Sequence, residues 1–87
     1  MNNDIKNLKK KLIYRSQYRG TKEMDKLVGS FVENYVHELS HSDLKELEIF
    51  LNLDDDIIYK IYNNQSYDLK VSNSVITKLF RKFEYNQ

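Results

Sequence analysis

The sequence contains no cysteine, no proline and no tryptophan, and only two of its 87 residues are glycine. Without cysteine the chain has no disulfide, no thiolate ligand for a metal and no thiol nucleophile. With no proline and little glycine, few residues interrupt helices, which favours an all-α protein. No apolar run approaches the roughly 20 residues of a membrane span, and the N-terminus lacks the apolar core of a secretory signal. These absences predict a soluble intracellular protein without a membrane segment.

The charges nearly cancel, because 14 lysines and arginines face 13 aspartates and glutamates, giving a net charge of +1. A domain that gains its affinity by neutralising phosphates is expected to be strongly basic, so nucleic acid is not the default partner. A chain of this length buries only about 60–65% of its unfolded surface and does not divide into two cores. Residues 1–87 are therefore expected to form a single domain.

Apolar residues at helical spacing predict two helices in the first half of the chain. The first runs from Ile5 to about Tyr18, with Asn3 or Asp4 as its cap. The second carries the strongest periodicity in the sequence, one continuous stripe from Met24 to Leu39. Its members are Met24, Leu27, Val28, Phe31, Val32, Tyr35, Val36 and Leu39.

Three further helices are predicted in the second half. Ser40 begins an S-x-x-D pattern that resembles a capping box, followed by an apolar stripe at residues 44–51. Three aspartates at 54–56 precede a fourth helix at 57–62, where a helix N-terminus favours negative charge. Residues 65–71 are polar and are expected to form a loop with some extended character. Ser72 or Asn73 then caps a last helix whose apolar face runs from Val75 to Phe83. The prediction is a compact bundle of five helices.

The stretch HELSH at residues 37–41 matches H-E-x-x-H, in which two histidines on one helix bind zinc. That motif needs an uninterrupted helix, but Ser40 is the predicted cap of the next helix and separates His37 from His41. The aspartates at 54–56 lack the spacing of a calcium loop, so helix capping is the preferred interpretation. No nucleotide-binding glycine motif and no catalytic triad is found. We expect no enzyme activity, no catalytic residue and no metal site.

The stretch RSQYRGTKEMD at residues 15–25 lies between the first two predicted helices. Gly20 occupies a position where positive φ or close approach of another backbone is useful. Glu23 falls in the first turn of the second helix, near its free N–H groups. Arg15 and Arg19, at i and i+4, are expected to project on one side as a donor pair beside Tyr18. The stretch is either a glycine corner with local capping or a surface that grips a carboxylate-bearing partner.

A family resemblance rests on these residues. The stretch YRSQYRGTKEMDKLVGSF resembles the R-S-x-x-R-G-x-x-E-M-D-x-x-x-G-x-F signature of the SdhE-type flavinylation factors of succinate dehydrogenase, which include a mitochondrial assembly factor. The likeness continues through LSHSDLKELEIFLNLDDDIIYKIY and covers about residues 12–62. Two departures are visible, since Asp56 and Ile61 stand where the family usually has proline and tryptophan.

The resemblance implies a non-catalytic five-helix chaperone that binds the flavoprotein subunit of succinate dehydrogenase, and sometimes of fumarate reductase. It also implies that the protein promotes covalent attachment of FAD to that subunit while holding no cofactor of its own. The R-G-x-x-E motif makes Arg19, Gly20 and Glu23 the expected partner-binding residues. Arg15, Asp25 and Tyr18 are secondary candidates, and the free protein is expected to be a monomer.

Because the likeness begins close to the N-terminus, no transit peptide is accommodated, and a bacterial cytoplasmic factor is expected. The alternative function is a small helical nucleic-acid-binding protein that uses a row of cations along the first helix. The members of that row are Lys9, Lys10, Lys11, Arg15 and Arg19.

Overall fold

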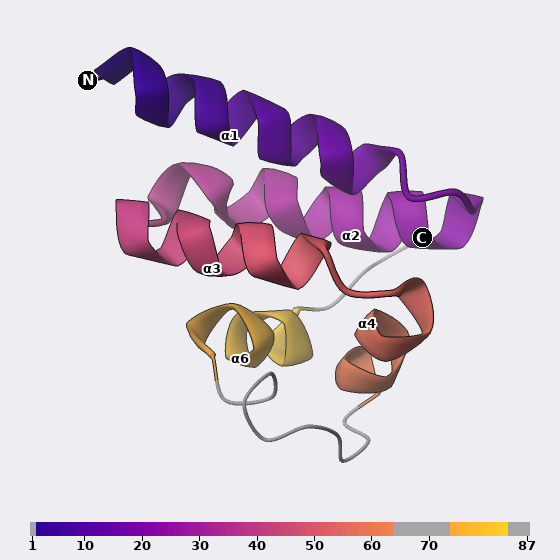
Figure 1. Cartoon of the computed structure of the whole chain (residues 1–87). Helices are drawn as coiled ribbons and strands as arrows, with labels where there is room; N and C mark the ends of the chain where they lie inside the picture. Colours follow the sequence, from indigo (N-terminus) through magenta and orange to yellow (C-terminus); the bar gives the residue numbers. More distant parts are fainter. Residues whose placement is uncertain (1, 64–73, 84–87) are drawn as a thin grey trace.

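The computed structural model describes residues 2–63 and 74–83 (Figure 1). These residues form α1 (Asn2–Gln17), α2 (Lys22–Tyr35), a 3-10 turn η1 (Val36–Glu38), α3 (His41–Leu51), α4 (Asp55–Tyr62) and α6 (Val75–Lys82). The expected all-α bundle is confirmed, since the described residues contain five α-helices and no strand. The predicted loop at residues 65–71 and the caps proposed at 72 and 73 lie outside the described residues.

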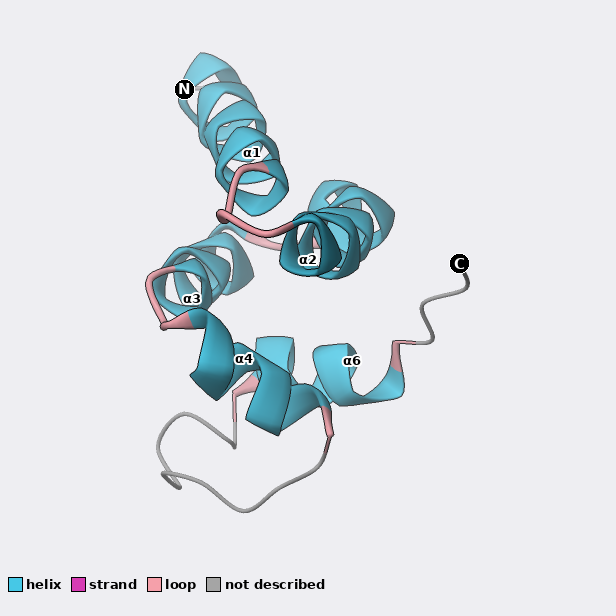
Figure 2. Cartoon of the chain, turned by 90° about the vertical axis from the view of Figure 1, so that its right-hand side faces the viewer, coloured by secondary structure: helices cyan, strands magenta, loops and turns pink. Residues whose placement is uncertain are grey.

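The helices are arranged in three layers. Figure 2 shows α1 on one side of the α2 and α3 pair, with α4 and α6 on the opposite side. The helix α1 packs on both α2 and α3, while α6 packs on α3 and α4. The corner between α1 and α2 lies at one end of this stack, and η1 lies at the other end (Figure 1). Within the described residues, no helix combines the length and the apolarity needed to cross a membrane.

The core is built from the predicted apolar stripes, and Phe31 of α2 lies at its centre. Its ring lies 4.9 Å from that of Phe80 and 6.1 Å from that of Phe50, both in edge-on contact. Tyr35 and Phe83 complete the cluster at 5.2 and 5.7 Å from Phe31. Such pairs add about 0.5–1.5 kcal/mol each beyond the area they bury. The aromatic cluster therefore joins α2, α3 and α6, which are far apart in sequence.

Gly29 allows α1 and α2 to pack closely. It is buried, and a Cβ added to it would lie 3.1 Å from the Cγ of Gln17 and 3.6 Å from the carbonyl oxygen of Ser16. Ser16 is also fully buried, and its hydroxyl donates to the carbonyl of Ile13 within α1. The small residues at this crossing bring the two helix backbones together next to the corner.

Serine side chains cap the starts of α3 and α6, and some helix ends differ from the predicted ones. The hydroxyl of Ser40 accepts a hydrogen bond from the amide of Asp43, as predicted. Because Leu39 and Ser40 must be extended for this cap, α2 ends at Tyr35 and η1 replaces its expected last turn. The last helix is capped by Ser74, whose hydroxyl accepts from the amide of Thr77.

The first helix also begins earlier than predicted. It starts at Asn2, so neither Asn3 nor Asp4 lies at its N-cap.

The HELSH stretch is divided between two elements. His37 lies in η1 and His41 is the first residue of α3, so the two histidines do not share a helix. The break predicted at Ser40 is confirmed.

Substitution Phe31→Ala is expected to lower the free energy of unfolding by about 3–5 kcal/mol, since it leaves a cavity among four other rings. Domains of this kind have total stabilities of about 5–15 kcal/mol, so the loss should be plain in urea denaturation followed by circular dichroism. Ile49→Ala is the control, because Ile49 is 65% exposed on α3. Equal losses in the two variants would contradict the central position of Phe31.

Candidate functional site

The corner between α1 and α2 presents open backbone at Gly20. Gly20 has a φ of 124°, so the predicted positive φ is confirmed. The residue is exposed, and no heavy atom lies within 4 Å of the position that a Cβ would take. A side chain would therefore meet no neighbour, but its backbone would be strained. The corner leaves the main chain accessible to another molecule.

Two side chains of α2 hold the backbone of the corner. The hydroxyl of Thr21 accepts from the amide of Met24 and caps α2. A carboxylate oxygen of Asp25 accepts from the amides of Arg19, at 2.5 Å, and Gly20, at 3.3 Å. Asp25 was expected to be a secondary partner-binding residue, but its side chain holds the backbone of the turn. It satisfies two amide groups that α1 and α2 leave without helical partners.

Glu23 lies in the first turn of α2, as predicted, and is exposed. It was expected near the free N–H groups at the start of α2, but the cap there is the hydroxyl of Thr21, which accepts from the amide of Met24. In residues 2–63 and 74–83 the structure records no hydrogen bond or ion pair of the Glu23 side chain. Glu23 is therefore an exposed carboxylate three residues after Gly20.

The side chain of Arg19 turns inward, so the expectation of an outward donor was wrong. Its guanidinium donates from Nη1 to the carbonyl of Leu51 and, at 2.6 Å, from Nη2 to that of Leu53. It also bonds Asp55, with Nε at 2.9 Å and Nη2 at 2.8 Å from the carboxylate. Only 10% of the side chain is exposed. Four contacts therefore use the planar fork of donors within the chain.

These contacts attach the corner to the connection between α3 and α4. Leu51 ends α3, so its carbonyl is one of the groups that a helix C-terminus leaves unpaired, and a cation is favourable there. Asp55 lies in the first turn of α4. The guanidinium thus joins the end of α1, the end of α3 and the start of α4. Sequence spacing did not show this, because the acceptors lie 32 to 36 residues from Arg19.

Arg15 in α1 and Arg19, two residues beyond its end, do project the same way, but toward the connection between α3 and α4. Nη2 of Arg15 donates to the side-chain oxygen of Asn52, next to the acceptors of Arg19. Lys11, one turn earlier, pairs with Glu48 of α3 at 2.9 Å. Three of the five cations required by the nucleic-acid alternative therefore have partners within the chain, and that row is not free to contact phosphates.

Two tyrosines form the exposed side of the corner. Tyr14 and Tyr18 are 64% and 68% exposed, and their rings lie 4.6 Å apart. They border a hollow of about 250 Å³ that is also lined by Arg15, Arg19 and Leu51. Tyr18 was a predicted site residue, and Tyr14 was not. The i, i+4 spacing of the two tyrosines is the sequence signal that indicates Tyr14 as well.

The corner has features that are common on protein-contact surfaces. It combines exposed backbone, two exposed aromatic rings and a solvated carboxylate, and tyrosine is common at protein interfaces. Within the described residues no group of three or more histidine, cysteine, aspartate or glutamate side chains is placed to hold a metal ion. The features that are present favour a docking surface.

Substitution Arg19→Ala is expected to destabilise the fold by about 2–4 kcal/mol, because it removes charged hydrogen bonds and leaves Asp55 and two carbonyls without this donor. Arg19→Lys should lose less, although one ammonium does not span three acceptors. Chemical denaturation measures both. Lys45→Ala is the control, since Lys45 is 57% exposed and lies 4.0 Å from Glu48. If the Arg19→Ala protein were as stable as the wild type, the structural role of this arginine would be contradicted, and partner contact would be its expected role again.

Comparisons with known proteins identify relatives from several eukaryotes. The chain is 39% identical to "Succinate dehydrogenase assembly factor 2, mitochondrial" of Dictyostelium discoideum, over 64% of this chain and 40% of that protein. It is 32% identical to the protein of the same name in Candida glabrata, over 100% of this chain and 60% of the relative. It is 33% identical to the protein of the same name in Saccharomyces cerevisiae, over 88% of this chain and 50% of the relative. The chain thus spans about half the length of these relatives.

The expected bacterial cytoplasmic localisation was wrong, because these relatives are eukaryotic and their names say mitochondrial. The inference had relied on where the likeness begins in this chain, which does not report on the cell that makes it.

No solved structure matches the chain. A family model described as "Flavinator of succinate dehydrogenase" matches residues 10–84, which confirms the SdhE-type resemblance and extends it toward both ends. The chain therefore belongs to the family of succinate dehydrogenase flavinators.

Proposed function

We propose that this protein is an assembly factor that binds the flavoprotein subunit of succinate dehydrogenase and promotes covalent attachment of FAD to it. The family match over residues 10–84 and the names of the relatives support this function, and those names favour the mitochondrion as its place of action. The single structural observation that carries the proposal is the accessible backbone at Gly20, held in a fixed turn between exposed tyrosines and Glu23.

A binding module is sufficient for this chemistry. The isoalloxazine ring supplies the electrophilic carbon, so a protein factor contributes geometry and electrostatics. Holding the accepting side chain and the flavin in a near-attack arrangement lowers a barrier by several kcal/mol without any catalytic group on the factor. We therefore assign the protein a chaperone-like role, in which it stabilises one conformation of the flavoprotein.

The motif residues divide into two groups in this proposal. Arg19 and Asp25 are positioning residues. The side chain of Arg19 attaches the turn to α3 and α4, and the carboxylate of Asp25 accepts from a backbone amide of the turn. Gly20 and Glu23 contact the partner, the first through exposed main chain and the second through its carboxylate. Tyr18 and Tyr14 supply apolar contact area beside them. This arrangement replaces the expectation from the sequence that the guanidinium of Arg19 binds the partner.

Gly20→Ala and Gly20→Arg separate backbone strain from access to the corner. Both impose a side chain on a residue with φ of 124°, at an expected cost of about 1–3 kcal/mol. The Cβ itself meets no neighbour, so only the arginine blocks approach of a partner. We expect covalent flavin attachment to be at least about tenfold slower with Gly20→Arg than with Gly20→Ala, while the two variants have similar stability. A tenfold change in rate corresponds to about 1.4 kcal/mol.

The measurement mixes the apo flavoprotein subunit, FAD and each variant, and follows flavin fluorescence in a denaturing gel. Ser42→Arg is the control, because it adds the same side chain at an exposed position near the start of α3, at the end of the bundle away from the corner. If fluorescence rises at the same rate with and without the added wild-type protein, the proposed function is wrong. If the two Gly20 variants behave alike, only the role of the open corner is contradicted.

A further inference from the structure

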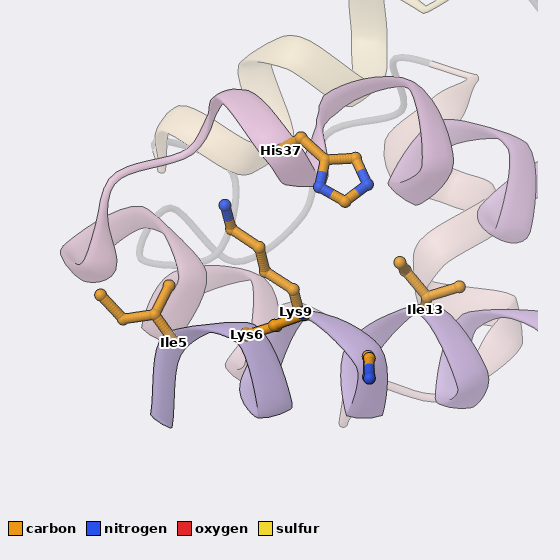
Figure 3. A pocket seen from close by; sticks show the side chains of 6 residues that line it. Ile5, Lys6, Lys9, Ile13 and His37 are labelled. Carbon is orange, nitrogen blue, oxygen red and sulfur yellow. The ribbon is translucent and has the colours of Figure 1, made fainter. Parts of the chain in front are cut away.

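A second hollow lies toward the other end of α1, where this helix faces η1. Its volume is about 420 Å³, and its lining comes from one side of α1 and from His37 across from it (Figure 3). The α1 residues are Ile5, Lys6, Lys9, Lys10 and Ile13. From the middle of this groove, near Lys9, α1 runs eight further residues to Gln17, about 12 Å at the rise of a helix. The groove is therefore separate from the corner.

The groove carries positive charge that the protein does not neutralise. In the part of the chain that the structure describes, no ion pair involves Lys6, Lys9 or Lys10. Asp4 and Glu38 are exposed nearby in sequence, but neither lines the groove. Lys11 on the neighbouring side of α1 differs, because it pairs with Glu48. The hydrogen bond and the charge of Lys11 lower the pKa of Glu48.

The wall of the groove is apolar as well as cationic. Ile5 and Ile13 are half-buried and lie at opposite ends of it (Figure 3). Lys9 is also half-buried, so part of its aliphatic stem lies against the protein while its ammonium reaches solvent. A ligand that fits here presents a small apolar group to the isoleucines and negative charge to the lysines.

We propose that this groove binds an acidic segment of a partner protein, with an aliphatic side chain seated between Ile5 and Ile13 and carboxylates against Lys6, Lys9 and Lys10. The concave shape and the volume suit a few side chains, whereas a bilayer surface or a duplex requires a broad basic face. Single-stranded nucleic acid is recognised on stacked aromatic rings, and no aromatic residue lines this groove apart from the imidazole of His37.

This inference does not depend on the proposed function. Charge complementarity alone selects the occupant, and the site adds to the corner a second contact on the same helix. Two separated contacts on one rigid helix define the orientation of a partner, which a single contact does not.

The test titrates the whole protein with a short synthetic peptide that contains leucines flanked by aspartate and glutamate, followed by amide and side-chain NMR shifts. A peptide with asparagine and glutamine in place of the acids is its control. We expect shifts at Ile5, Lys9, Ile13 and His37, little change at Gly20, and weaker binding as salt increases.

Two variants with the same change in net charge locate the site. One replaces Lys6, Lys9 and Lys10 with glutamine, and the other replaces Lys22, Lys26 and Lys78, three exposed lysines outside the groove. The first should weaken binding about tenfold, since each exposed ion pair contributes only a small factor, and the second less than about twofold.

Several outcomes would overturn the proposal. These are no shift at millimolar peptide, equal losses in the two variants, or equal binding of the amide control peptide. Tighter binding in the same groove by vesicles that contain anionic lipid, or by a single-stranded RNA, would also overturn it and identify the other class of partner.

Discussion

The arrangement of this protein depends on the guanidinium of Arg19. It bonds the carbonyls of Leu51 and Leu53 and the carboxylate of Asp55, and so connects the end of α1 to the turn between α3 and α4. The aromatic cluster around Phe31 joins α2, α3 and α6, and the apolar core extends to Leu51 and Ile58 on this side of the molecule. In a chain of 87 residues the core is thin, so polar contacts at the helix connections add to it. Arg19 supplies the most extensive of these at the corner.

The exposed backbone of Gly20 is a consequence of that attachment. A residue with positive φ between two helices is normally a point of flexibility. Here the residue before it is held by its side chain to α3 and α4 and by its amide to Asp25. Adjacent residues of one motif therefore point in opposite directions, with Arg19 into the protein and Gly20 toward solvent. Rigid support of an open main chain reduces the entropy lost when a partner orders it.

Local patterns in the sequence predicted the parts of the structure that local physics determines. The stripe from Met24 to Val36 predicted the buried face of α2 and η1, and the S-x-x-D pattern predicted the break at Ser40. The position of Gly20 between two helices predicted its positive φ. The direction of Arg19 was missed, because its acceptors come from α3 and α4 and two of them are backbone carbonyls that no side-chain pattern reveals. Ser74 was missed because Ser72 and Asn73 carry equally good capping groups.

The same limitation applies to charge. The sequence presented the cations from Lys9 to Arg19 as one row, whereas the fold gives its members different environments. Lys11 and Arg15 face α3 and its following turn, where Glu48 and Asn52 accept from them. Lys6, Lys9 and Lys10 line a groove where, among residues 2–63 and 74–83, no ion pair involves them. Since attraction to a distant partner is determined by the charges left uncompensated, the groove side of α1 is the side proposed for recognition, whereas the α3 side makes contacts within the chain.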